Sequence, residues 1–121
     1  MSALTLLAVG CVGGVGACAR LLLDGTVSPR FVGPFPYGTL LVNVSGSFVL
    51  GLLVGIALEG DAYRIAGVGL IGAFTTFSTW MFESHRLGED GQARLAAVNV
   101  VVALVLGVSC AWVGRKVGLA L

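Results

Sequence analysis

Long apolar stretches separated by short polar segments fill almost the whole chain. A helix needs about 20 apolar residues to cross the ~30 Å hydrocarbon core of a bilayer. Four stretches meet that length, and we place the predicted spans at Ala3–Leu23, Gly38–Leu58, Ile65–His85 and Leu95–Val113. The pattern predicts an all-α membrane protein with four transmembrane helices.

The segments between the predicted spans are short. They cover Asp24–Tyr37, which holds all three prolines, Glu59–Arg64 and Arg86–Arg94. None of them is long enough for a soluble domain, so we expect residues 1–121 to form a single four-helix transmembrane domain. That layout leaves no room for a catalytic head, and no nucleic-acid partner is expected.

Composition agrees with this layout. Of the 121 residues, 57% are hydrophobic and only 11% are charged, and the mean hydropathy is +1.01. Soluble domains carry about 25% charged residues. We therefore expect an integral, multi-pass membrane protein in contact with lipid.

Polar residues interrupt the third predicted span near its middle. Residues 72–80 read Gly-Ala-Phe-Thr-Thr-Phe-Ser-Thr-Trp, with four hydroxyls and a glycine. Hydroxyls compete for backbone groups, and glycine weakens a helix. Unwound backbone at membrane depth is tolerated only where it is buried in protein or lines a polar cavity. We expect the third helix to be broken at mid-membrane and to free carbonyls such as those of Gly72 and Thr75, a kind of ligand that binds Na⁺ in transporters.

A polar stripe marks the second predicted span. Thr39, Asn43 and Ser47 follow one another at four-residue spacing, which places them on one face of a helix. Polar side chains in a membrane need a partner across a helix interface or contact with water. Hydrogen bonds between helices would explain the stripe, and so would a polar pathway through the membrane. The sequence leaves both explanations open.

Two aromatic residues accompany the hydroxyls of the third span. Phe77 and Trp80 lie three residues apart and share a helix face, next to Thr76, Ser78 and Thr79. Aromatic residues at this spacing often simply pack together. Their ring edges also carry positive quadrupole charge, which favours an anion lying in the ring plane. Packing and an anion pathway are both consistent with the pattern.

The acidic residues avoid the middle of every predicted span. All lie in loops or within about one turn of a span end: Asp24, Glu59, Asp61, Glu83, Glu89 and Asp90. Proton-coupled transport generally uses Asp, Glu or His inside the membrane, so this distribution argues against a proton-driven pump. The sequence shows no nucleophile–base pair and no cluster of metal-ligating side chains, so we do not expect an enzyme.

Basic residues divide almost evenly between the two sides of the predicted bundle. The side of both termini carries Arg64, Arg115 and Lys116, and the opposite side carries Arg20, Arg30, Arg86 and Arg94. Orientation normally follows an excess of Lys and Arg in cytoplasmic loops, and three against four gives little bias. Either unassigned charges blur the count, or the chain has dual topology and its copies pair antiparallel.

Three motifs follow one another along the chain. They are Gly13-Gly14-x-Gly16-Ala17-x-x-Arg20, then Gly38-Thr39-Leu40-x-Val42-Asn43-x-x-Gly46-x-Phe48-x-x-Gly51, then Gly72-x-x-Thr75-Thr76-Phe77-Ser78-Thr79. With these motifs and the four-span layout, the chain closely resembles the Fluc/CrcB family of fluoride channels over essentially its whole length. Arg20, which ends the first motif, is assigned a structural role.

The resemblance implies an antiparallel, dual-topology dimer in the cell (inner) membrane that encloses two fluoride pores. It also implies passive export of F⁻, which relieves fluoride toxicity in the cytoplasm. It implies a structural Na⁺ at the dimer interface, held by backbone carbonyls of Gly72 and Thr75 from each subunit. The family's pore phenylalanines correspond to Phe77 and to position 80, and its span-two asparagine corresponds to Asn43. The predicted anion pathway comprises Thr39, Asn43, Ser47, Thr76, Phe77, Ser78, Thr79 and Trp80.

Two regions depart from the family pattern. Trp80 stands where the family usually has phenylalanine, so one pore aromatic is larger and carries an N–H donor. The family's pore hydroxyls of the fourth span fall at Ala103 and Gly107, with Asn99 one turn earlier. These differences concern the anion path and leave the expected fold unchanged.

Two other functions compete with the fluoride channel. A small multidrug-type proton-coupled transporter has a similar length and four spans, but it depends on a glutamate in its first span. Ala3–Leu23 contains no acidic residue. A membrane scaffold without transport would not explain the mid-membrane hydroxyls. We expect a homodimer, and pairing with a related chain of opposite fixed orientation stays open.

Overall fold

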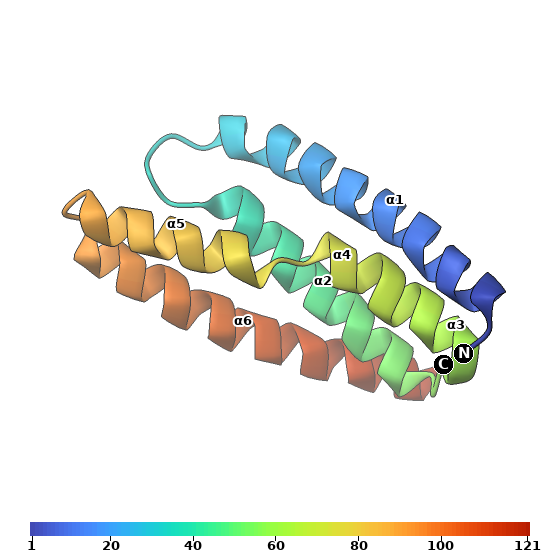
Figure 1. The fold of residues 1–121 in the computed structure, drawn as a ribbon. Helices are drawn as coiled ribbons and strands as arrows, with labels where there is room; N and C mark the ends of the chain where they lie inside the picture. The colour runs from blue at the N-terminus through green and yellow to red at the C-terminus, as the bar shows by residue number, and fades with distance from the viewer.

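Four long helical rods make up the fold (Figure 1). The computed structural model describes residues 1–121. The rods are α1 (Ala3–Val27), followed by the short 3₁₀ helix η1 (Ser28–Arg30), α2 (Tyr37–Gly55), a composite third rod over Gly60–Glu89, and α6 (Ala93–Ala120). All four are long and apolar enough to span a membrane, which confirms the predicted all-α architecture of four spanning helices.

The third rod is broken in its middle. It comprises α3 (Gly60–Tyr63), the π-helical η2 (Arg64–Ile71), the single turn α4 (Gly72–Phe74) and α5 (Phe77–Glu89). Between α4 and α5 the chain is extended: Thr75 has φ −79° and ψ 159°, and Thr76 has φ −146° and ψ 123°. The predicted break is confirmed at the middle of the span.

The end of α2 differs from the predicted boundary. The helix stops at Gly55 rather than Leu58, because Ala57 takes a left-handed conformation with φ 55°. The N–H groups of Ala57 and Leu58 then bond back to the carbonyls of Val54 and Leu53, which closes the helix in a Schellman motif. The apolar sequence does not reveal this turn, because the conformation of one residue ends the helix and not a change in polarity.

The other three rods run beyond their predicted ends. α1 continues to Val27 instead of Leu23, the third rod to Glu89 instead of His85, and α6 to Ala120 instead of Val113. The prediction ended these spans near the charged residues Asp24, Arg86 and Arg115. Arginine, lysine and glutamate are good helix formers, so the last two helices continue through them, and in α1 the Asp24 carboxylate accepts from the Ser28 hydroxyl one turn later. Apolar content therefore located the spans but not their last turns.

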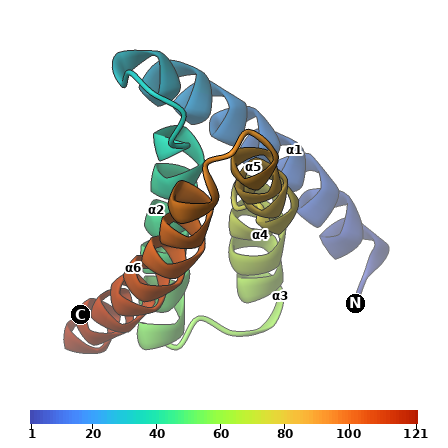
Figure 2. The ribbon, with the colours of Figure 1, turned by 90° about the vertical axis from the view of Figure 1, so that its left-hand side faces the viewer.

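Close contacts between the rods depend on glycine. Where α2 packs along α6, a Cβ on Gly51 would collide with the Ala111 carbonyl oxygen. A Cβ on Gly114 would likewise collide with the Phe48 carbonyl oxygen. Seen along the bundle, α2 and α6 lie together, α3, α4 and α5 follow beside them, and α1 crosses over the top (Figure 2). Small residues allow membrane helices to approach until their backbones touch.

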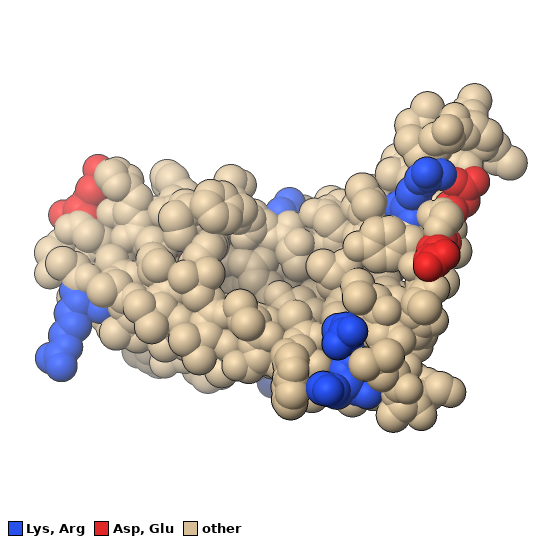
Figure 3. Space-filling view, turned by 90° about the horizontal axis from the view of Figure 1, so that it is seen from below, with Lys and Arg blue, Asp and Glu red and all other residues tan.

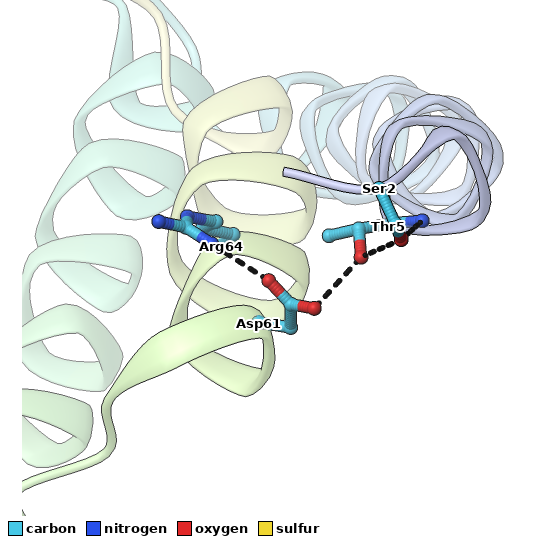
Figure 4. A network of polar contacts seen from close by, with 4 residues as sticks. All are labelled: Ser2, Thr5, Asp61 and Arg64. Carbon is cyan, nitrogen blue, oxygen red and sulfur yellow. Dashed lines mark hydrogen bonds and ion pairs between the residues drawn. The ribbon is translucent and has the colours of Figure 1, made fainter.

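A polar network joins the start of α1 to the start of the third rod (Figure 4). Thr5 Oγ1 donates to Asp61 Oδ2 at 2.8 Å, and Arg64 Nη1 contacts Asp61 Oδ1 at 2.7 Å. Ser2 caps α1, because its hydroxyl accepts from the Thr5 N–H at 3.1 Å. The network holds the two rods together at the end of the bundle where both chain termini lie (Figure 1).

In the view of Figure 3 the acidic residues lie only near the two ends of the molecule, and the surface between them is mostly uncharged, with a few basic residues. Few residues are buried within the chain, only 17 of 121, and no span has more than 33% of its most apolar window buried. Most of the apolar surface therefore faces outward. Lipid or a partner chain is the environment that such a surface requires.

Replacing Gly114 with leucine should disrupt the contact between α6 and α2, because the side chain would have to occupy the position of the Phe48 carbonyl. Overpacking typically costs about 1–3 kcal/mol, so the melting temperature in detergent should fall by several degrees. Gly25→Ala is the matched control, since nothing lies within 4 Å of a Cβ built there. An unchanged melting temperature for Gly114→Leu would contradict this packing.

Candidate functional site

The break in the third rod borders an open hollow of about 260 Å³, lined by α2 and by both halves of the rod. Seven predicted site residues line this hollow together: Asn43, Ser47, Gly72, Thr75, Thr76, Phe77 and Trp80. The other four do not line it: Arg20, Thr39, Ser78 and Thr79. Residues from α2, α4, α5 and the extended segment between the last two thus meet at one place along the bundle.

Asn43 pairs with the backbone at the break. Its Oδ1 accepts a hydrogen bond from the Thr76 N–H, and its Nδ2 donates to the Thr76 carbonyl, both at 2.8 Å. Because Thr76 is extended, the amide of Asn43 replaces hydrogen bonds that the break removes. The amide has a second N–H that this pairing does not use.

The threonine hydroxyls act on the helix ends at the break. Thr76 is the N-cap of α5, where its Oγ1 accepts from the Thr79 N–H at 3.2 Å and donates to Thr79 Oγ1 at 3.0 Å. Thr75 Oγ1 donates to the Ile71 carbonyl at 3.0 Å. Ser78 is exposed and has only a 3.4 Å contact with the Thr76 hydroxyl. Three of the four hydroxyls therefore stabilise the break itself.

The break removes the helical donors of several backbone carbonyls, and those of Gly72 and Thr75 are among them. In a continuous helix, the Gly72 carbonyl would accept from the Thr76 N–H and the Thr75 carbonyl from the Thr79 N–H. Here the Thr76 N–H bonds to Asn43, and the Thr79 N–H bonds to Thr76 Oγ1. The freed carbonyls include the two that the sequence predicts as Na⁺ ligands, and hard oxygen donors of this kind fit a hard cation.

Phe77 and Trp80 form one wall of the hollow. Their ring centroids are 5.6 Å apart and their planes meet at 82°, an edge-to-face pair. The shared face predicted from their three-residue spacing is confirmed. Trp80 also donates its indole N–H to the Asn99 carbonyl of α6 at 3.3 Å. The donor that distinguishes tryptophan from phenylalanine is thus bonded to the protein.

A smaller hollow of about 130 Å³ shares Thr76 with the first and is bordered by Arg20, Thr39 and Thr79. Arg20 has no salt bridge within the chain. Thr39 donates its hydroxyl to Glu83 Oε1 of α5 at 2.7 Å. The polar stripe of α2 therefore makes hydrogen bonds between helices and also borders the hollows, so both explanations of the stripe find support.

Glu83 is a polar site residue that the sequence analysis missed. Its position near a span end gives it no predicted role. In the structure it is half-buried, and its Oε2 atom is buried without a hydrogen-bond partner. It also borders a third hollow of about 410 Å³, together with Asp24 and Arg86. Only the register of α5 against α2 brings the Glu83 carboxylate to Thr39, and no local sequence pattern reports that register.

Four helices suited to span a membrane, one of them broken near its middle beside a polar hollow, define this chain as a helical channel or transporter rather than a membrane anchor. Comparison with known sequences gives the family. A family model described as CrcB-like protein, Camphor Resistance (CrcB), matches residues 7–115, and the chain belongs to this family. The resemblance inferred from the three motifs is confirmed.

Relatives extend along almost the whole chain. A protein of Mycolicibacterium paratuberculosis named fluoride-specific ion channel FluC 2 is 50% identical over 108 residues, which are 89% of this chain and 88% of the relative. FluC 2 of Mycobacterium bovis is 51% identical over 104 residues, 86% of this chain and 82% of the relative. FluC 1 of Symbiobacterium thermophilum is 40% identical over 116 residues, 91% and 94% of the two chains.

Asn43→Ala should destabilise the break, because the Thr76 N–H and carbonyl would lose their partner at membrane depth. Each unsatisfied buried group costs about 1–3 kcal/mol, so the melting temperature should fall and the Thr76 amide should exchange hydrogen faster. Ser47→Ala is the control, since the Ser47 hydroxyl donates only to the Asn43 carbonyl within α2, at 2.7 Å. Equal exchange rates at Thr76 in the two variants would show that Asn43 does not hold the break.

Proposed function

We propose that this chain forms a fluoride-selective channel that passively exports F⁻ and so relieves fluoride toxicity in the cytoplasm. The observation that carries the proposal is its membership of the CrcB-like family, with relatives named fluoride-specific ion channels that align along most of the chain. The polar hollow at mid-membrane supports the same function, because an ion crosses a membrane where protein groups replace its water.

An anion in this hollow would meet a free amide N–H, other polar side chains and an aromatic edge. The polar side chains of the lining are Asn43, Ser47, Thr75, Thr76 and Trp80, and the lining contains no Asp or Glu. The second N–H of Asn43 can donate to an anion, and ring edges favour an anion in the ring plane. This lining suits passive anion movement rather than proton coupling, and nothing supports the small multidrug-type transporter.

The proposal includes a second chain that covers the break. Gly72 and Phe77 are exposed at the middle of the span, Phe77 by 71%. Irregular backbone facing lipid is unfavourable, so a partner is needed to enclose it. The near-even division of basic residues favours an identical chain inserted in the opposite orientation, which gives an antiparallel homodimer in the inner cell membrane. A related chain of fixed orientation is the alternative partner.

A structural Na⁺ at the centre of this dimer belongs to the same proposal. Gly72 and Thr75 would provide two backbone carbonyls from each subunit, and a symmetric pair of chains would supply twice the ligands of one chain. The charge of the ion would lower the cost of bringing an anion into a low-dielectric site nearby.

Liposomes that contain only this protein should release fluoride much faster than chloride under equal gradients. Passive conduction should need no pH gradient, and protein-free liposomes should release neither ion quickly. Ion-selective electrodes measure both rates. Equal release of the two anions, or fluoride release only under an imposed proton gradient, would contradict the proposal. Release by this chain alone would also exclude an obligatory heterodimer.

The Na⁺ site makes a prediction about two neighbouring positions. Thr75→Ser should leave assembly and fluoride efflux nearly unchanged, because the ligand is a backbone atom and serine keeps a hydroxyl for Ile71. Gly72→Leu should weaken dimerisation. Within one chain the nearest atom to a Cβ there is the Gly67 carbonyl oxygen at 3.8 Å, so the clash would be with the partner. Cross-linking in Na⁺-containing bilayers measures the dimer fraction. A Gly72→Leu variant that dimerises normally would rule out this arrangement.

A further inference from the structure

Trp80 is held by a polar cluster where α5 meets α6. Its indole Nε1 donates to the Asn99 carbonyl at 3.3 Å. Asn99 Nδ2 donates to Ser84 Oγ at 2.8 Å, and Ser84 Oγ donates to the Trp80 carbonyl at 2.8 Å. These three residues, the Trp80 cluster, therefore form a closed set of hydrogen bonds that links the two helices.

The centre of the Trp80 cluster is almost completely buried. Asn99 is 1% exposed and Ser84 is 7% exposed. A buried amide without partners is unfavourable, and more so at membrane depth, where water cannot replace them. The Asn99 amide is therefore fixed to Ser84. The carbonyl that accepts the indole N–H belongs to the backbone of α6, so the bond between Asn99 and Ser84 acts by holding α6 against α5 where this carbonyl meets the indole.

Trp80 stands between two hollows. The first is the 260 Å³ hollow at the break, and the second, about 310 Å³, lies along α6 beside Ala103 and Gly107. Asn43 and Ser47 border both hollows, whereas Trp80 is the only residue of the third rod that lines the second. The position of the indole ring therefore decides how the two spaces communicate.

We propose that Asn99 is a positioning residue that, acting through Ser84, holds the Trp80 indole as a fixed wall of the anion path. This inference rests on the proposed fluoride function. Phe77 contacts one side of the ring, but the small residues Ala103 and Gly107 leave space on the α6 side, and a ring with space on one side changes orientation more easily. The bond to Asn99 also occupies the indole N–H, so the ring offers an anion the positive C–H edge that phenylalanine would offer.

The test uses the full-length chain in liposomes with Trp112→Phe, which leaves Trp80 as the only tryptophan. Quenching of Trp80 fluorescence by acrylamide reports how firmly the ring is held, and this readout does not depend on ion flux. Fluoride and chloride efflux from the same liposomes reports the anion path.

Asn99→Leu and Ser84→Ala each remove the hydrogen bond between these two side chains. Asn99→Leu changes the buried contact between α5 and α6 more than Ser84→Ala does. Both should increase quenching of Trp80 and lower the fluoride-to-chloride efflux ratio about three- to eightfold, the scale of one or two interhelical hydrogen bonds in a membrane. The control on the same helix is Ser109→Ala, because Ser109 is exposed and bonds only to the Val105 carbonyl. It should change neither readout.

A double-mutant cycle separates positioning from general stability. In a Trp80→Phe background there is no indole N–H to hold, so Ser84→Ala should alter the efflux ratio much less than it does beside Trp80. Equal effects in the two backgrounds would overturn the proposal, because they would assign Ser84 and Asn99 to helix packing alone.

The remaining outcomes are distinct. Unchanged quenching of Trp80 in both Asn99→Leu and Ser84→Ala overturns the positioning role of Asn99. If Asn99→Leu fails to assemble, the quenching measured in Ser84→Ala alone decides whether that role stands. Increased quenching with an unchanged efflux ratio overturns the role of the ring in the anion path. If the unmutated chain releases no fluoride, the proposed function fails, while the quenching comparison still decides whether Asn99 holds the ring.

Discussion

A backbone N–H or carbonyl inside a membrane must find a protein partner, because no water is available to replace it. In this chain the requirement is most severe at Thr75 and Thr76, whose extended backbone interrupts the helical hydrogen bonds. Asn43 of α2 satisfies both backbone groups of Thr76, and the Thr76 hydroxyl starts the next helix. The break is therefore stable only when α2 lies against it, and the position of α2 fixes the hollow beside it.

Close approach of the helices makes this pairing possible. Gly46 lies one turn after Asn43, and a Cβ there would collide with the Thr75 side chain. The absence of a side chain also allows close packing at Gly51 and Gly114, where α2 lies against α6. Small residues and one amide thus act together: the glycines bring the helices into range, and Asn43 supplies the hydrogen bonds that the broken helix lacks.

The constraint is met only in part within a single chain. The Gly72 and Thr75 carbonyls have lost their helical donors, and Phe77 is exposed beside them. Gly72, Thr75 and Phe77 all line the polar hollow. The freed carbonyls and the exposed Phe77 ring need contacts that a single chain does not provide. The proposed dimer, cation and anion path would each supply some of these contacts, and this need links the three proposals.

The sequence by itself determined the four spans, the mid-membrane break and the shared face of Phe77 and Trp80. Each depends on apolar length, local backbone preference or helical spacing, which are properties of neighbouring residues. Only the tertiary structure decided that Thr39 bonds to Glu83 and that Asn99 fixes the tryptophan ring. Such pairs join different helices, so they depend on how each helix is rotated and shifted against the next. That register results from packing of the whole bundle, and no local pattern encodes it.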